Sequence, residues 1–178
     1  VFTRGSTEAI NLVAHSFGQL LQQGDEIIIS QMEHHSNIVP WRLLADSKEL
    51  NLRWAPVTDS GELDYPQLAD MVNERTRLIA ISHMSNVTGT INDVARIVEI
   101  ARSRSVPVLL DGSQSAVHLP VDVQALDCDF FVFTGHKLYG PSGIGALYAK
   151  GDWLDRLPPY MGGGEMIADV YEDRVTFA

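Results

Sequence analysis

Apolar segments of strand-like length alternate with amphipathic segments of helical periodicity over residues 1–133. The expected strands span residues 1–3, 26–30, 52–57, 78–85, 106–110 and 128–134. The expected helices span residues 7–21, 38–50, 65–73 and 93–105. Because the helices lie between strands, the pattern predicts an α/β fold, a mostly parallel sheet with helices on both faces. Residues 144–149 form a further apolar segment after a short connection, and we expect this strand to lie antiparallel to the one before it.

Polar side chains that could bind a ligand or react with it follow these strands at their carboxyl ends. In parallel α/β sheets, ligands bind outside this edge, because the edge is where the strands deliver their loops. We therefore expect a single ligand site there. Its candidate residues are Thr7, His34, Asn86, Asp111, Gln114, His136 and Lys137.

Lys137 lies in a tight, glycine-rich turn between two apolar runs, in the stretch FFVFTGHKLYGPSGIGALY. The chain has only two other lysines, Lys48 in a polar segment and Lys150 beside a glycine. A lysine held between buried strands is partly desolvated, which favours the neutral, nucleophilic amine. The alternative is a surface lysine whose stem packs on the protein while its amine stays in water.

Asp111 follows an apolar strand, and a lone carboxylate is costly there unless a cation or several donors meet it. Ser6 and Thr7 fall at the start of the first expected helix, where free backbone N–H groups and hydroxyls can bind an anion. Ordinary helix capping is the alternative explanation for these two residues.

The adjacent histidines His34 and His35 follow the second expected strand. They fit no zinc-ligand spacing with the nearby carboxylates or the cysteine, so we expect no metal site. One of the two rings could instead stack on a planar ligand. Cys128 begins a buried strand and is interpreted as a small core residue, with a nucleophile as the alternative.

Composition excludes several classes of function. The formal net charge is −10, from 13 basic and 23 acidic residues, which disfavours binding to nucleic acid or to an anionic membrane. No apolar run approaches the roughly 20 residues that span a bilayer. A single cysteine suits a reducing, cytoplasmic location. The chain begins without Met, in the middle of an apparent strand, so we expect it to be part of a longer protein.

One ligand would account for the candidate residues together. A lysine amine, a carboxylate, an imidazole face, helix-start hydroxyls and further donors at Thr134 and His136 match the parts of pyridoxal 5'-phosphate (PLP). In such a site the lysine forms a Schiff base with the aldehyde and the aspartate keeps the ring nitrogen protonated. The histidine stacks on the ring, while hydroxyls and backbone amides hold the phosphate.

Six segments of the sequence resemble the fold type I, class V aminotransferase family of PLP enzymes. Within that family, they are most similar to cysteine desulfurases of the SufS and CsdA (NifS-like) type, a group that also includes selenocysteine lyases. The segments are RGSTEAIN, MEHHSNIVPW, HMSNVTGT, LLDGSQSAVH, DCDFFVFTGHKLYGPSGIGALY and YMGGGEMI.

The resemblance implies a role for each matching residue. It implies Lys137 as the Schiff-base lysine and carrier of the Cα proton, Asp111 as the partner of the ring nitrogen, and His34 as the stacking residue that also relays protons. Gln114 and Asn86 would lie near the ring hydroxyl, with Asn86 also near the substrate carboxylate. The implied phosphate-binding residues are Ser6, Thr7, Thr134 and His136.

The resemblance also implies a reaction, in which sulfur passes from L-cysteine to an enzyme cysteine as a persulfide and L-alanine is released. The product would supply iron–sulfur cluster assembly through a sulfur-acceptor protein, and the enzyme would be a homodimer with YMGGGEMI near the dimer contact. Residues 1–178 would be the central, PLP-binding large domain, without an N-terminal segment and the small C-terminal domain. The nucleophilic cysteine and the substrate-binding arginine would lie outside these residues, so the fragment alone is expected to be inactive. A selenocysteine lyase and a noncatalytic cofactor-binding or dimerisation module remain as alternatives.

Overall fold

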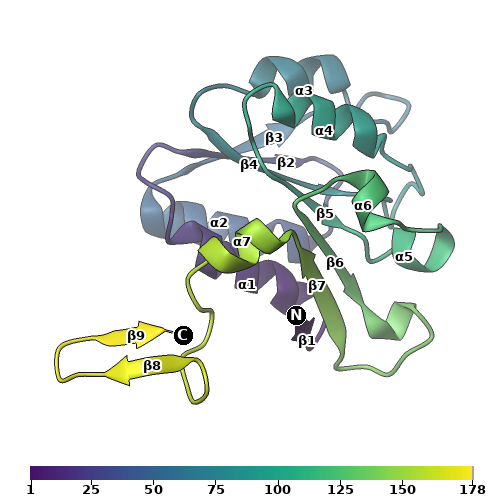
Figure 1. Ribbon diagram of the computed structural model, residues 1–178. Coiled ribbons are helices and arrows are strands. Elements are labelled where there is room, and N and C mark those ends of the chain that lie inside the picture. The colour runs from purple at the N-terminus through teal and green to yellow at the C-terminus, as the bar shows by residue number, and fades with distance from the viewer. Residues whose placement is uncertain (178) are drawn as a thin grey trace.

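The computed structural model describes residues 1–177. Its main sheet has seven strands in the order β1-β7-β6-β5-β4-β2-β3 (Figure 1). Neighbouring strands from β3 to β6 pair in parallel, whereas β7 is antiparallel to both β6 and β1. The predicted mostly parallel sheet with an antiparallel strand near its C-terminal part is therefore confirmed. The strands are β1 (Phe2–Thr3), β2 (Glu26–Ser30), β3 (Asn51–Ala55), β4 (Thr76–Ser82), β5 (Val108–Asp111), β6 (Phe130–Thr134) and β7 (Gly145–Ala149).

Helices cover both faces of this sheet, as Figure 1 shows, with α1, α2 and α7 on one side and α3 and α4 on the other. Within residues 1–177, the longest apolar helix falls short of what a membrane crossing needs. The helices are α1 (Ser6–Gly18), α2 (Val39–Lys48), α3 (Tyr65–Met71), α4 (Val94–Arg102), α5 (Ser115–His118), α6 (Val123–Leu126) and α7 (Gly151–Arg156), with short 3-10 turns η1 (His35–Asn37) and η2 (Gly135–Lys137).

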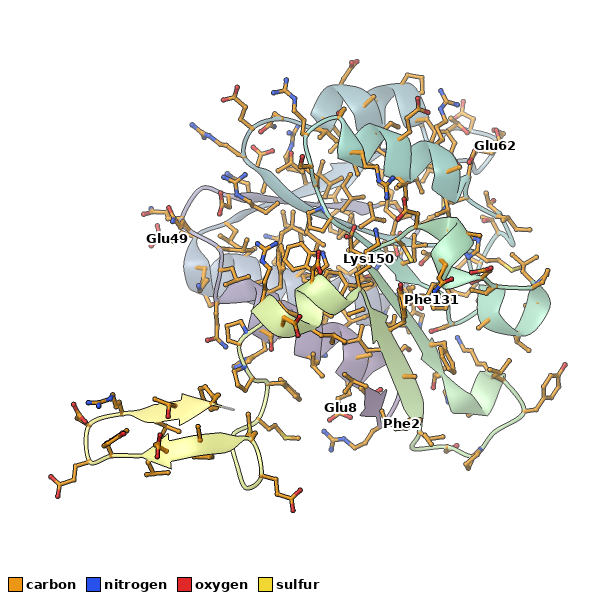
Figure 2. The ribbon with its side chains drawn as sticks, in the orientation of Figure 1. Phe2, Glu8, Glu49, Glu62, Phe131 and Lys150 are labelled. Atoms are coloured by element: carbon orange, nitrogen blue, oxygen red, sulfur yellow. The ribbon has the colours of Figure 1, made fainter. Side chains whose placement is uncertain are left out.

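Successive residues of a strand point to opposite faces of the sheet. Because helices cover both faces, the central strands carry apolar residues on both sides. In β2, Ile27 and Ile29 pack under α1 and α2, while Ile28 packs under α3 and α4. In β6, Phe130 faces α1 and Phe131, labelled in Figure 2, faces the other layer. The uninterrupted apolar runs in the sequence are thus the mark of strands buried between two helical layers.

Several element ends differ from the sequence-based expectation. The strand expected at 78–85 ends at Ser82, because the chain then folds back on itself: Ser85 donates its N–H to the carbonyl of Thr90, and Asn92 donates its N–H to the carbonyl of His83. The short helices α5, α6 and α7 were not predicted, since each is too short to show a helical period.

A two-stranded hairpin, β8 (Ile167–Val170) and β9 (Val175–Phe177), was also not predicted. It forms a separate antiparallel pair that projects from the body of the domain (Figure 1). Its side chains extend into open space in Figure 2, and Val170, Tyr171 and Phe177 are among the exposed apolar residues.

Candidate active site at the carboxyl edge of the sheet

One cavity, with a volume of about 640 Å³, opens at the carboxyl edge of the parallel strands. Every candidate site residue from the sequence lines it, although the residues come from five separate parts of the chain. Their roles remain predictions, but their convergence on one cavity is a fact of the fold. These residues are Ser6, Thr7, His34, Asn86, Asp111, Gln114, Thr134, His136 and Lys137.

Lys137 reaches this cavity from η2, the turn that directly follows β6. It is half-buried, and its amine makes no hydrogen bond or ion pair with any residue in the described chain. The other two lysines are committed elsewhere: Lys48 donates to the carbonyl of Leu21 at 3.2 Å, and Lys150 pairs with Asp127 at 2.7 Å. Lys137 is therefore the lysine whose amine is available to a ligand.

Asp111 ends β5 and is only 5% exposed. One of its oxygens, Oδ1, accepts a hydrogen bond from the backbone N–H of Ser113 at 2.9 Å. Within residues 1–177 no cation pairs with this carboxylate, and its Oδ2 accepts no hydrogen bond. Because Asp111 lines the cavity with one carboxylate oxygen uncommitted, the site favours a ligand that brings a positive N–H group.

Gly112 follows Asp111 and packs directly against the ring of Phe131. A Cβ atom on this residue would lie 1.9 Å from Cζ of Phe131, so no other residue fits without displacing the buried ring of Phe131. The N–H of Gly112 donates to the carbonyl of Val132 at 2.8 Å, which holds the end of β5 against β6. Asp111 therefore has a fixed position relative to the strand that delivers Lys137.

The start of α1 approaches the end of β6 very closely and forms a cradle for an anion. A Cβ atom on Gly145 would lie 2.6 Å from Cα of Gly5, and one on Gly5 would lie 3.3 Å from Oγ1 of Thr134. In the described chain, the N–H groups of Ser6 and Thr7 have no protein acceptor. These free donors and the hydroxyl of Thr134 suit a phosphate group.

Two histidines, His136 and His34, complete the site. Oγ1 of Thr134 and Nδ1 of His136 lie 3.0 Å apart, so the hydroxyl and the imidazole orient one another. His34 lies across the cavity on the loop before η1, and its Nδ1 is 2.8 Å from Oγ of Ser36. This contact leaves the face of the His34 ring available for stacking.

The adjacent histidines His34 and His35 differ in their position relative to the cavity. Only His34 lines the cavity, although the two ring centroids are 6.0 Å apart. Residues 1–177 contain no group of His, Cys, Asp and Glu side chains arranged to hold a metal ion.

Sequence reasoning missed several residues that also line the cavity. Ser82 ends β4 beside Asp111, whereas the sequence predicts a strand that continues to residue 85 and so places Ser82 inside the sheet. Tyr160 reaches the cavity from the segment after α7, and its ring meets that of His15 edge-on at 5.6 Å. No local pattern indicated Tyr160, because its position depends on a long-range packing contact.

Cys128 lies outside this cavity. It is fully buried among apolar residues of the α3–α4 layer, as expected for a core residue. Burial raises the pKa of its thiol to about 11, so the reactive thiolate is almost absent at neutral pH.

We predict that Cys128 in the native protein reacts with iodoacetamide at pH 8 at least about 100-fold more slowly than a free cysteine, because both burial and the raised pKa oppose reaction. Mass spectrometry of the Cys128 peptide over time would measure this. The urea-unfolded protein is the control and should react rapidly. Equal rates in the native and unfolded protein would contradict the placement.

Comparison with known proteins agrees with this geometry. The aminotransferase class-V family model matches residues 1–178. A cysteine desulfurase of Dickeya dadantii is 57% identical over 171 residues, which cover 96% of this chain and 42% of that protein. The chain thus spans less than half the length of the curated relatives that it matches.

Solved structures give the same result. The crystal structure of the cysteine desulfurase CsdA from Escherichia coli superposes with a TM-score of 0.94 at 45% identity, covering 100% of this chain and 45% of that one. A C-DES mutant with glycine covalently linked to its PLP cofactor superposes with a TM-score of 0.87 at 31% identity, covering 99% of this chain and 47% of that one.

Proposed function

The chain belongs to the aminotransferase class-V family, and from this premise we propose that residues 1–178 are the cofactor-binding domain of a PLP-dependent cysteine desulfurase. The observation that carries the proposal is the single cavity that receives both an uncommitted lysine and a buried, unpaired aspartate. The identity of 57% to a cysteine desulfurase selects the reaction from those of the wider family.

The residues of the cavity fit PLP part by part. Asp111 would accept a hydrogen bond from the protonated ring nitrogen, which gives its buried charge a partner. The free N–H groups at the start of α1 and the hydroxyl of Thr134 would hold the phosphate, with Ser6, Thr7 and His136 around it. Gln114 and Asn86 would contact the ring hydroxyl. When bound, PLP supplies an electron sink that stabilises negative charge on the substrate carbon next to the amino group.

Lys137 and His34 would perform the steps that need a protein side chain. The amine of Lys137 would hold the cofactor aldehyde covalently and, once released by the incoming substrate amine, carry the Cα proton. His34 would stack on one face of the ring and relay protons from its free Nε2, since Nδ1 is engaged with Ser36.

The substrate we propose is L-cysteine. Its sulfur would pass to a thiol of the enzyme as a persulfide, and the remaining three-carbon unit would leave as L-alanine. Cys128 is not that thiol, because it is buried outside the cavity. The acceptor would therefore be a cysteine elsewhere in the full-length protein, and a sulfur-acceptor protein of iron–sulfur cluster assembly would take the sulfur next.

We also propose a homodimer in the cytoplasm. An isolated two-stranded hairpin is marginally stable in water, so the exposed apolar residues of β8 and β9 favour cover by a second subunit. The single cysteine of the chain suits a reducing compartment. Sedimentation of the full-length protein tests the dimer directly.

The function is tested with the full-length protein loaded with PLP. Visible absorbance should report cofactor uptake, and incubation with L-cysteine should yield alanine and enzyme-bound persulfide in equal amounts. A parallel reaction with L-selenocysteine distinguishes a selenocysteine lyase, which would form alanine from that substrate alone. A protein that stays colourless after PLP addition would instead be a noncatalytic module.

A further inference from the structure

Glu33 is a buried carboxylate next to the cavity that the proposed reaction does not use. It is 7% exposed and does not line the cavity, although its neighbour His34 does. Within residues 1–177 no cation pairs with it. Its partners are hydrogen-bond donors only, so its role must be sought in what those donors connect.

The donors to Glu33 come from three separate elements. Oε1 accepts from the hydroxyl of Ser30 and, at 3.0 Å, from the backbone N–H of Ser82. Oε2 accepts from Nδ2 of Asn37 at 2.7 Å and from the hydroxyl of Ser82 at 2.6 Å. Ser30 ends β2, Ser82 ends β4, and Asn37 belongs to η1, so one carboxylate joins two neighbouring strand ends to the turn after His34.

The network continues into the core. Nε1 of Trp41 donates to Oδ1 of Asn37 at 2.9 Å, which fixes the orientation of the Asn37 amide. Trp41, Asn37 and Ser30 are all fully buried. Burial raises the pKa of Glu33, while the hydrogen bonds from Ser30, Ser82 and Asn37 oppose that rise.

The position of His34 depends on the hydrogen bonds that Ser30, Asn37 and Ser82 donate to Glu33, which we call the anchor. His34 has an extended backbone (φ −67°, ψ 149°), so its side chain points away from that of Glu33. Among residues 1–177 its ring is hydrogen-bonded only to Ser36 on its own loop, and its carbonyl accepts from the N–H of Asn37 at 2.8 Å. With Glu33 drawn inward and Asn37 held, His34 is directed outward into the cavity.

We propose that Glu33 is a positioning residue that holds His34 in place against the cofactor by joining its loop to the ends of β2 and β4. The inference rests on the proposed function, because it concerns the ring on which His34 would stack. It goes beyond that function by making cofactor geometry depend on a residue that touches neither cofactor nor substrate.

The site requires an oxygen at both positions of the Glu33 carboxylate. Oε1 faces the N–H of Ser82 and Oε2 faces the amide NH₂ of Asn37, and neither donor can turn away. A glutamine would place its own NH₂ group against one of these donors in either orientation. Glu33→Gln therefore preserves the shape and breaks the anchor.

The test is performed on the full-length protein. We expect Glu33→Gln to raise the dissociation constant for PLP about tenfold and to reduce the visible circular dichroism of bound PLP by more than about half, because His34 is no longer fixed. In the cofactor-free protein, amide hydrogen exchange over residues 31–37 should become faster. Glu26→Gln is the matched control: Glu26 begins β2, at the end of the strand away from the cavity, and its carboxylate accepts hydrogen bonds from Arg53 and Asn73, so PLP affinity should change less than about twofold.

A double-mutant cycle with His34→Ala separates positioning from general stability. If Glu33 acts through His34, Glu33→Gln should change PLP affinity less than about twofold when His34 is already absent. Equal losses in both backgrounds, or unchanged affinity and dichroism in the single variant, would overturn the inference. If Glu33→Gln does not fold, Ser30→Ala takes its place, with an expected loss of about threefold.

The wild type separates this inference from the function on which it rests. A wild-type protein that takes up no PLP overturns both. A wild type that binds PLP, with a Glu33→Gln variant that binds it identically, overturns the positioning role alone.

Discussion

Replacement of Lys137 by alanine is expected to eliminate covalent attachment of PLP and to lower alanine formation by about 10⁴-fold or more. The reason is that the chain offers no substitute. Lys137 lines the cavity with an uncommitted amine, whereas Lys48 and Lys150 are bound to other residues outside it. Without this amine, both the attachment point of the cofactor and the proposed carrier of the Cα proton are lost.

Borohydride reduction followed by peptide mass spectrometry measures the attachment directly. The wild type should carry the reduced cofactor on Lys137, and the Lys137→Ala variant should carry none. Lys48→Ala is the matched control, since it removes a lysine without touching the cavity and should retain both cofactor and turnover. Cofactor trapped on another residue, or turnover near that of the wild type, would show that Lys137 does not hold the proposed role.

Much of the site could be predicted because parallel strands deliver their carboxyl ends to one edge. Asp111, Asn86 and Lys137 are distant in sequence, but each follows a strand that the apolar pattern revealed. Once the strand–helix alternation indicated a parallel sheet, their convergence followed from topology. The antiparallel β7 was predictable for a similar reason, because its connection to β6 is too short for a crossover.

The features that escaped prediction depend on contacts between distant parts of the chain. Glu33 lies in the polar segment MEHHSN, where a glutamate is ordinarily exposed to solvent, and only the fold shows that Ser30, Asn37 and Ser82 enclose it. Tyr160 enters the cavity because α7 packs on the sheet and returns the chain toward α1. Neither placement leaves a periodic signal in the sequence.

Asp111→Ala is expected to weaken PLP binding by about tenfold or more and to lower turnover by at least about 10³-fold. The carboxylate at the end of β5 is buried, accepts one hydrogen bond from Ser113 and has no cationic partner among residues 1–177. A protonated ring nitrogen would donate a hydrogen bond to this carboxylate. Loss of the negative charge would leave that nitrogen unprotonated and the ring a poorer acceptor of electrons.

Asp111→Asn sharpens the test, because it keeps the size of the side chain. If its amide oxygen retains the bond from the N–H of Ser113, its NH₂ group points into the cavity, where it would oppose the N–H of the ring. Titration with PLP and steady-state alanine formation measure both effects. Asp129→Asn is the control: Asp129 accepts bonds from Val108 and Trp153 outside the cavity, so its loss should lower stability and leave PLP affinity unchanged.

Thermal unfolding of the cofactor-free protein distinguishes a functional carboxylate from a structural one. The Asp111 carboxylate accepts one hydrogen bond, from its near neighbour Ser113, so Asp111→Ala should change the melting temperature of the cofactor-free protein only slightly. In the same assay, Asp129→Asn should lower it, since two hydrogen bonds are weakened. A strongly destabilised Asp111→Ala protein with normal turnover per folded molecule would mean that Asp111 supports the sheet. The opposite result, a stable protein that binds PLP poorly, is what a carboxylate kept for a ligand requires.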